Sequence, residues 1–268
     1  MLKRSFLFIC ILFQLAWCQA QDITGIVKDA KTNQSLAFVN VGVIGKGIGT
    51  VTDDNGRFAI TLHNNGADSL RISMIGYIPK SFLLSDYQSG KIIALVPNNI
   101  HLQEVNIASN QLKEKILGNK TQSKTTSAGF NDNALGHEIG EIIHIKKSPT
   151  FVKRFYASLA NPATDSVKLR LNIYSVKKGL PDKIIQQQNI YVTVYKGQQN
   201  ITVNLEPYHI IVNDNFFVGL EWIENSYGSG IMFSASLLSS PMISRETSQA
   251  DWEKIGIAGI GFTVLAAY

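Results

Sequence analysis

The chain has 268 residues, enough for two domains of ordinary size, each with its own hydrophobic core. Its 25 basic and 20 acidic residues give a formal net charge of +5, and the basic residues are scattered apart from Lys146-Lys147 and Lys177-Lys178. Proteins that bind nucleic acid usually concentrate basic residues on one face, so the composition argues against a nucleic-acid partner.

The first twenty residues have the layout of a secretory signal peptide. Lys3 and Arg4 supply a positively charged start, residues 6–17 form an apolar run, and the small residue Ala20 ends the segment. This run is shorter than the roughly 20 residues that a membrane-spanning helix needs. We therefore expect residues 1–20 to be removed on export and the mature chain to contain no transmembrane span.

Both cysteines lie inside this segment. Cleavage after Ala20 would remove Cys10 and Cys18 and leave no thiol, disulfide or sulfur ligand. The competing interpretation is a lipoprotein cleavage site before Cys18, which would anchor the chain through a lipid. Trp17 argues against it, because such sites place a small residue directly before the cysteine.

Alternating apolar residues predict the first β-strands. Residues 39–43, 58–62 and 70–74 place an apolar side chain at every second position, which is typical of strands with one buried face. Between them, residues 53–56 tolerate a left-handed backbone and predict a tight hairpin before Phe58. These positions serve folding, and none of them needs to react.

The same stretch carries a family resemblance. Its motifs are GIVKD at 25–29, LAFVNV at 36–41, GTVTDDNGRF at 49–58, LRISMIGY at 70–77 and LQEVNI at 102–107. In order and spacing they resemble the carboxypeptidase-like regulatory domain, over about residues 22 to 107. The resemblance implies a seven-stranded, transthyretin-like Greek-key sandwich across residues 21–108, closed by a strand at 102–107. Such modules often stand in front of envelope receptors, peptidases and adhesins of Gram-negative bacteria.

A change of composition follows this domain. Residues 109–127 are rich in Lys, Gln, Asn, Ser and Thr, and they predict a linker. Its first part, residues 111–117, could form two helical turns that end at Gly118, a helix-stop residue. The second domain would then cover residues 128–268.

The C-terminal region alternates more clearly. Along residues 167–174, apolar side chains at odd positions alternate with Lys168, Arg170, Asn172 and Tyr174, so we expect an antiparallel sheet with one buried and one solvated face. Runs at 190–194, 201–205 and 216–222 keep the period of two, and short strands at this spacing indicate a sandwich. The predicted fold is therefore all-β, with a second β-sandwich that is jelly-roll-like by analogy.

Two patterns of His and Glu require testing as metal sites. His101 and Glu104 have the His-x-x-Glu spacing of zinc carboxypeptidases, and His209 lies about as far downstream as a third ligand would. That peptidase fold needs a large α/β domain around its zinc, whereas these residues belong to a closing strand followed by further strands. We interpret the spacing as accidental.

The second pattern begins at His137-Glu138. A zincin helix requires another His four positions after the first, but Glu141 stands there. The isoleucines of residues 139–145 favour a strand with surface polar groups, on which His137 and His144 point to opposite faces. We therefore predict no metal, no cofactor and no catalytic residue.

Aromatic residues of the C-terminal region are the remaining candidates. Tyr191 and Tyr195 fall on the face opposite the apolar side chains of residues 190–194, where exposed rings could stack on sugars or contact a protein. Trp222 continues the apolar face of residues 216–220, so we expect it in the core. The candidate binding surface is Tyr191, Tyr195, Tyr227 and Trp252.

These features together predict a non-catalytic, exported envelope protein, located in the periplasm or at the outer membrane or cell surface. In this interpretation the regulatory-type sandwich carries a second sandwich that binds an envelope polysaccharide or a protein partner. The alternative is a hydrolase-associated or metallopeptidase-like enzyme with an unrecognised active site. Converging His, Glu and Asp residues in a cleft would favour an enzyme, and an aromatic or apolar surface patch would favour binding.

Overall fold

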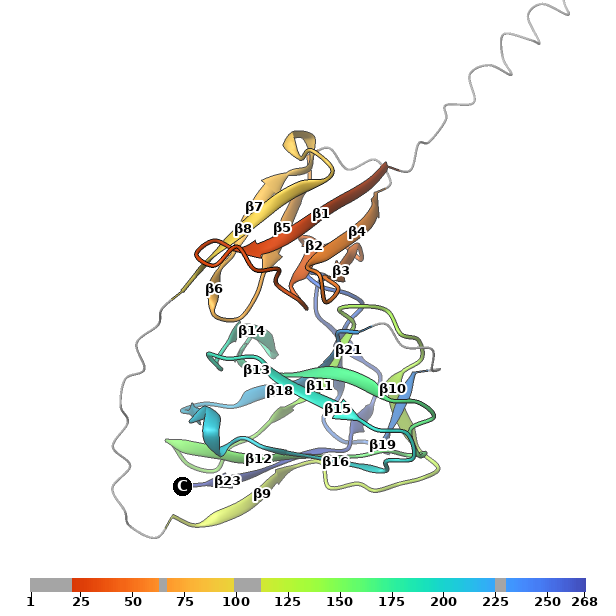
Figure 1. The fold of residues 1–268 in the computed structure, drawn as a ribbon. Helices are drawn as coiled ribbons and strands as arrows, with labels where there is room; N and C mark the ends of the chain where they lie inside the picture. The colour runs from red at the N-terminus through yellow and green to blue at the C-terminus, as the bar shows by residue number, and fades with distance from the viewer. Residues whose placement is uncertain (1–20, 63–66, 99–111, 225–229) are drawn as a thin grey trace, which may run out of the picture.

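The structure is a computed structural model that describes residues 21–62, 67–98, 112–224 and 230–268, and it is all-β as predicted (Figure 1). The described residues form two units with separate hydrophobic cores, here called the N-terminal unit (residues 21–98) and the C-terminal unit (residues 112–268). None of the described residues forms a helix long and apolar enough to span a membrane. The predicted signal peptide lies outside the described residues.

The N-terminal unit is a sandwich of two four-stranded sheets. The first has the order β4 (Arg57–Leu62), β1 (Gln21–Asp29), β8 (Lys91–Pro97), β6 (Tyr77–Ile78). The second has the order β3 (Gly49–Val51), β2 (Asn40–Val43), β5 (Ser69–Ser73), β7 (Lys80–Leu83). The 3-10 turn η1 (Leu84–Asp86) follows β7. Strand β1 pairs parallel with β8, and the other ladders of the unit are antiparallel.

The described part of this unit contains eight strands, one more than the resemblance implied. Pro79 separates β6 from β7 and, having no N–H, cannot donate to a ladder. Strand β6 pairs with β8 in the first sheet, whereas β7 pairs with β5 in the second, so the chain changes sheets at this point. The expected closing strand at 102–107 lies outside the described residues.

The C-terminal unit is a second β-sandwich, as predicted. Its seven-stranded sheet has the order β14 (Leu180–Ile184), β13 (Val167–Lys177), β18 (Phe216–Trp222), β11 (Glu138–Ile143), β20 (Met242–Arg245), β21 (Glu253–Ile255), and β15 (Ile190–Val194) also pairs with β13. The facing five-stranded sheet has the order β16 (Asn200–Asn204), β12 (Thr150–Ser158), β23 (Phe262–Ala267), β9 (Glu114–Gly118), with β17 (Ile211–Val212) paired to β12. A three-stranded sheet contains β10 (Ser127–Phe130), β19 (Ile231–Leu237) and β22 (Ala258–Ile260), and η2 (Glu206–Tyr208) is a single 3-10 turn.

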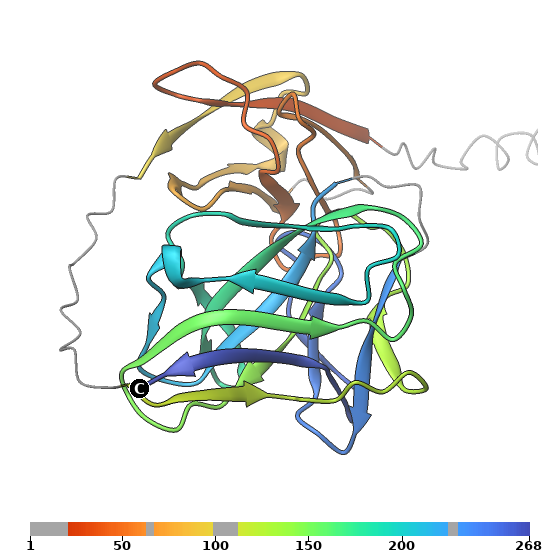
Figure 2. The ribbon, with the colours of Figure 1, turned by 60° about the horizontal axis from the view of Figure 1, so that its bottom comes forward.

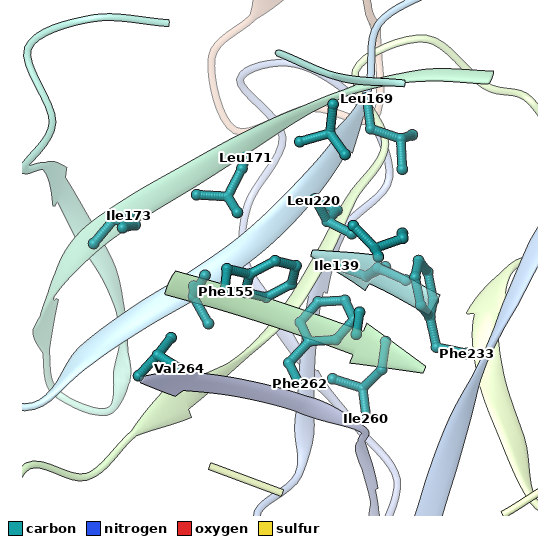
Figure 3. Close-up of a cluster of buried hydrophobic side chains, with 14 of the residues drawn as sticks. Ile139, Phe155, Leu169, Leu171, Ile173, Leu220, Phe233, Ile260, Phe262 and Val264 are labelled. Carbon is teal, nitrogen blue, oxygen red and sulfur yellow. The ribbon is translucent and has the colours of Figure 1, made fainter. Parts of the chain in front are cut away.

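The core of this unit lies between the two large sheets. Phe155, Phe262 and Val264 point from the five-stranded sheet toward the apolar side chains of β13, β18 and β11 (Figure 3). Trp222 is fully buried and belongs to the same cluster, so its predicted place in the core is confirmed. The alternation predicted for β15 is confirmed too, because its buried and exposed residues alternate along the strand.

The predicted linker is wrong for the segment that forms β9. Residues 114–118 pair antiparallel with β23, and Leu117 enters the core of the C-terminal unit. A helix over residues 111–117 is therefore also wrong in the part that the structure describes. The misleading feature is composition, because β9 is an edge strand that begins with the exposed charged residues Glu114 and Lys115, and edge strands often carry charged side chains.

The N-terminal unit sits on the outer face of the seven-stranded sheet, above β13 and β14 (Figures 1 and 2). That face was predicted to be solvated. The prediction is wrong, because Arg170 and Asn172 are each only 2% exposed and Tyr174 is 6% exposed. The alternation correctly separated two faces of β13, but both faces are buried.

We expect Val192→Ala to lower the free energy of unfolding by about 1–3 kcal/mol, because Val192 is buried in the core and truncation leaves a cavity. Tyr195→Ser, directly after the end of β15, is the matched control at an exposed position. Tyr195 is 65% exposed, so its replacement should change stability by less than about 0.5 kcal/mol. Urea denaturation of both variants checks this, and a larger loss for the tyrosine variant would invert the assignment of faces.

Candidate ligand-binding cleft between the two units

Four charged side chains form a row across the outer face of the seven-stranded sheet. Strand register places Arg170 of β13 beside Glu221 of β18, then Glu138 of β11, then Arg245 of β20. Like charges directly opposite each other on a sheet are destabilising. The two neighbouring glutamates are therefore compensated by the arginine at each end of the row.

The row is held by short, charge-assisted hydrogen bonds. Arg170 donates to Glu221 Oε2 from Nε at 3.0 Å and from Nη2 at 2.8 Å. Arg245 Nη2 donates to Glu138 Oε2 at 2.7 Å. All four side chains are at least nine-tenths buried, where an unpaired charge would be strongly unfavourable.

Two neutral side chains of β13 complete the network. Asn172 Nδ2 donates to Glu138 Oε1 at 3.0 Å and to Glu221 Oε2 at 2.8 Å. The Tyr174 hydroxyl donates to Glu138 Oε2 at 3.0 Å. Burial raises the pKa of Tyr174 well above its usual range, so its hydroxyl keeps the proton that it donates. Burial also raises the pKa of Glu138, and Arg245 opposes that shift.

The N-terminal unit reaches into this network through β2. Asn40 Nδ2 donates to Glu221 Oε1 at 2.9 Å, and Arg170 Nη2 donates to Asn40 Oδ1. Arg170 Nη1 also donates to the carbonyl oxygen of Phe38 at 2.8 Å. Glu221 thus accepts hydrogen bonds on both carboxylate oxygens, and one of its donors comes from the other unit.

A second contact joins the units through the loop between β20 and β21. Gly45 N donates to Gln249 O at 3.0 Å, and Gln249 Nε2 donates to Ser73 Oγ at 3.0 Å. At Gly42 the loop approaches so closely that a Cβ atom would lie 2.0 Å from the carbonyl oxygen of Ser248. Only glycine fits there, so β2 is shaped for this contact.

A cleft of about 740 Å³ lies between the two units and borders both contacts. The N-terminal unit contributes Asn40, Arg71, Asn98 and the segment 73–77 to its lining. The C-terminal unit contributes segments 181–184 and 186–188, Trp252, and the network residues Arg170, Asn172, Tyr174, Glu221 and Arg245. The site therefore exists only where the two units meet.

Of the predicted binding residues that the structure describes, Trp252 lines this cleft. Its ring lies edge-on to Tyr174 and Phe217, with centroids 5.5 and 5.1 Å away, and the Arg245 guanidinium lies 4.7 Å from the ring centroid. These contacts fix the indole against the charged row. A ligand in the cleft would meet a ring that is already oriented.

Tyr191 and Tyr195 are placed differently. Tyr191 is 43% exposed, but its ring packs edge-on against Phe38 of the N-terminal unit at 5.5 Å between centroids. Tyr195 is freely exposed, and neither tyrosine lines the cleft. Tyr227 lies outside the described residues. A binding role for these tyrosines stays a prediction.

Sequence reasoning missed the polar residues of the cleft. Arg170, Asn172 and Tyr174 were recognised as one face of β13, but that face was assigned to solvent. Glu138 was expected among surface polar groups, and it is fully buried instead. The only signal in the sequence was the bulk and hydrogen-bonding capacity of these side chains, which does not reveal what covers them.

The His and Glu patterns fall in separate places. His101 and Glu104 lie outside the described residues, and His209 ends η2 in a left-handed conformation. Within the described ranges, no three His, Cys, Asp or Glu residues come together as a metal site. The strand predicted from 137–144 is confirmed as β11, and His137 lies half-buried beside Ser244, with its Nε2 3.1 Å from Oγ.

Glu141 also contradicts the prediction of surface polar groups on this strand. It shares a face of β11 with Ile139 and Ile143, two residues of the core, and is only 1% exposed. Burial raises the pKa of Glu141 to about 8, and the hydrogen bond from Asn119 N at 3.0 Å offsets only part of that effect. The carboxyl is therefore largely neutral at neutral pH.

Comparison with known families assigns the first unit. Residues 23–107 match the family model of the CarboxypepD_reg-like domain, which confirms the resemblance of the sequence motifs. The N-terminal unit is a carboxypeptidase regulatory-like domain. The match covers about a third of the chain and leaves the C-terminal unit unassigned. No curated protein matches the sequence.

Solved structures show only distant likeness. One is the cysteine protease and lectin-like domains of Cwp84, a surface layer associated protein of Clostridium difficile, at 8% identity and a TM-score of 0.45. That alignment covers 93% of this chain, which spans 63% of the length of the other. A putative carbohydrate binding protein from Bacteroides uniformis has 10% identity and a TM-score of 0.24, with 92% of this chain and 97% of that chain covered. Similarities this low do not bear on function.

We expect Arg170→Met to lower the free energy of unfolding by about 3–5 kcal/mol, because it leaves the buried carboxylate of Glu221 without its paired cation. Lys168→Met on the same strand is the control. Lys168 pairs with Glu224 where both side chains are about a third exposed, so its loss should cost less than about 1 kcal/mol. Chemical denaturation at neutral pH compares the two, and equal losses would show that the charged row does not hold the structure.

Glu141 predicts a specific pH dependence of stability. Its folded-state pKa of about 8 exceeds the ordinary value of 4.5, so the folded protein holds a proton that the unfolded chain releases between these pH values. Stability should therefore be fully present at low pH and fall as pH rises through this window. Glu141→Gln should lack this loss, so its advantage over the wild type should grow from about pH 5 to about pH 9 in urea denaturation. A constant difference would contradict the raised pKa.

Proposed function

We propose that this chain is a non-catalytic binding protein of a bacterial cell envelope and that it holds a glycan in the cleft between its two units. The observation that carries the proposal is the polar lining of a 740 Å³ cleft to which both units contribute. Binding sites commonly lie where two domains meet, with a few fixed polar groups that set orientation.

The chemistry of the lining favours a sugar over an apolar protein surface. Exposed amides of Gln187 and Gln188 border the cleft, and each can both donate to and accept from sugar hydroxyl groups. Trp252 supplies one aromatic ring, whose amphipathic body suits a sugar in contact with water. Protein hot spots usually need larger apolar anchors, and the exposed aliphatic side chains Leu237, Leu238 and Ile257 lie away from this lining.

The carboxylates of the cleft support binding rather than catalysis. General acid–base chemistry needs a side chain that is free to exchange a proton with the substrate. In the lining, the acidic residues are Glu221 and Asp182. Both carboxylate oxygens of Glu221 already accept hydrogen bonds, from Arg170, Asn172 and Asn40. Glycoside hydrolysis needs a pair of available carboxyl groups, and in this lining Asp182 has no second one to work with.

Location in the envelope rests on the first twenty residues, whose charge and apolar run suit export. The regulatory-like domain agrees with this assignment, as such modules often stand in front of envelope proteins. In this proposal that domain does more than carry the second sandwich. It supplies one wall of the site.

Intrinsic fluorescence offers a direct test on the chain from residue 21 onward. Of its two tryptophans, Trp222 is fully buried and Trp252 lines the cleft, so a bound ligand should change emission mainly from Trp252. We expect a saturable change on titration with one or more hexasaccharides from a panel of glucose, xylose, mannose and galacturonate hexamers. Trp252→Phe should abolish the signal.

Paired variants locate the binding. Replacing Gln187 and Gln188 together by alanine should weaken binding about thirtyfold, since each of the two lost hydrogen bonds costs about 1 kcal/mol. Tyr195→Ser should bind as the wild type does, because Tyr195 is exposed outside the cleft. Loss of binding in the Tyr195 variant alone would move the site to β15 and contradict the proposal.

A further inference from the structure

We infer that the cleft selects an anionic saccharide, whose acidic group is bound by Arg71 from one unit and Lys183 from the other. This inference rests on the proposed function and specifies its ligand class. It starts from the charges of the lining. In the part of the chain that the structure describes, the lining contains four basic side chains (Arg71, Arg170, Lys183 and Arg245) and two acidic ones (Asp182 and Glu221).

Two of these basic side chains are already paired with buried carboxylates. Arg170 is paired with Glu221, and Arg245 is paired with Glu138 directly beneath the lining. The buried row is therefore electrically balanced by itself. The groups left to meet a ligand are Arg71, Lys183 and Asp182, and their sum is positive.

Arg71 is half-buried on β5. Among the described residues its guanidinium makes no hydrogen bond or ion pair, although its strand neighbours across the sheet are Gly42 and Ser81. A half-buried guanidinium with unused donors is a ready site for an oxyanion, which it can bind through two parallel hydrogen bonds.

Lys183 provides the second positive charge, from β14 on the opposite unit. Its ammonium group also has no partner among the residues that the structure describes. Asp182 precedes it and also lines the cleft, so it offsets one of the two free positive charges and leaves the other in excess. An acidic group between the two units would thus meet cations from both.

A third donor lies deeper in the cleft. Arg245 lines it, and its Nε is buried without a hydrogen-bond acceptor in the described part of the chain. A buried donor left unpaired is unfavourable, and an oxygen-rich ligand that reaches the row would relieve that cost. Gln187 and Gln188 add amide donors to the same cleft.

The test compares an acidic hexamer with its neutral ester and with a sulfated hexamer. The chain from residue 21 onward is titrated by calorimetry with galacturonate hexamer, with its fully methyl-esterified counterpart, and with a sulfated galactan hexamer. We expect the galacturonate hexamer to bind at least tenfold more tightly than the ester, with the difference shrinking as salt is raised. If the sulfated hexamer alone binds, the anion is a sulfate, and the assignment to Arg71 and Lys183 still holds.

Matched variants separate a specific site from general attraction. Arg71→Gln and Lys183→Gln should each lower the affinity for the acidic hexamer about tenfold and leave the affinity for the ester unchanged. Arg57→Gln and Lys177→Gln remove the same charges from exposed positions outside the cleft and should have no effect. Thermal melting confirms that each variant is folded.

The outcomes also distinguish this inference from the proposed function. Equal binding of the acid and the ester, weakened by replacing Gln187 and Gln188 with alanine, would keep the cleft as a glycan site and overturn its anion selectivity. An equal effect of Arg57→Gln and Arg71→Gln would overturn the assignment of Arg71. If no hexamer binds and Trp252 emission never changes, both the inference and the proposed function are wrong.

Discussion

The arrangement of the two units depends on two glutamates that lie side by side beneath the N-terminal unit. Glu138 and Glu221 are direct neighbours on adjacent strands, and both are fully buried. Such a pair persists only if cations and donors surround it. Arg170 and Arg245 supply the cations, and Asn172 and Tyr174 supply neutral donors from the same face.

The N-terminal unit completes this arrangement rather than merely covering it. Asn40 bridges Arg170 and Glu221 with its two amide atoms, and Phe38 offers a backbone carbonyl to Arg170. Polar networks of this kind add little net stability compared with an apolar interface, but a misplaced partner leaves charges unpaired. The charged row therefore favours a single arrangement of the two units. That arrangement also determines the shape of the cleft, because several network residues belong to its lining.

Strand β11 shows how strongly the surroundings decide the chemistry of a carboxyl group. Glu138 faces the N-terminal unit and lies against Arg245, whereas Glu141 faces the core side beside Ile139 and Ile143. Three positions apart, these two side chains point to opposite faces of the sheet. Burial raises the pKa of both carboxyl groups, but in the described part of the chain an arginine opposes the shift only at Glu138.

The sequence by itself determined the β class, the motifs of the regulatory-like domain, and the face that each residue of β4, β13 and β15 occupies. Period-two alternation is a local property, so it survives whatever the strands later pack against. Only the tertiary structure decided that Arg170 and Asn172 are buried, that β9 joins the five-stranded sheet of the C-terminal unit, and that Arg71 and Lys183 line one cleft. The first and the third depend on how the two units dock, and the second depends on the pairing of β9 with β23. All three bring together residues more than a hundred positions apart. No local pattern records which strand will be the neighbour or which unit will cover a polar face.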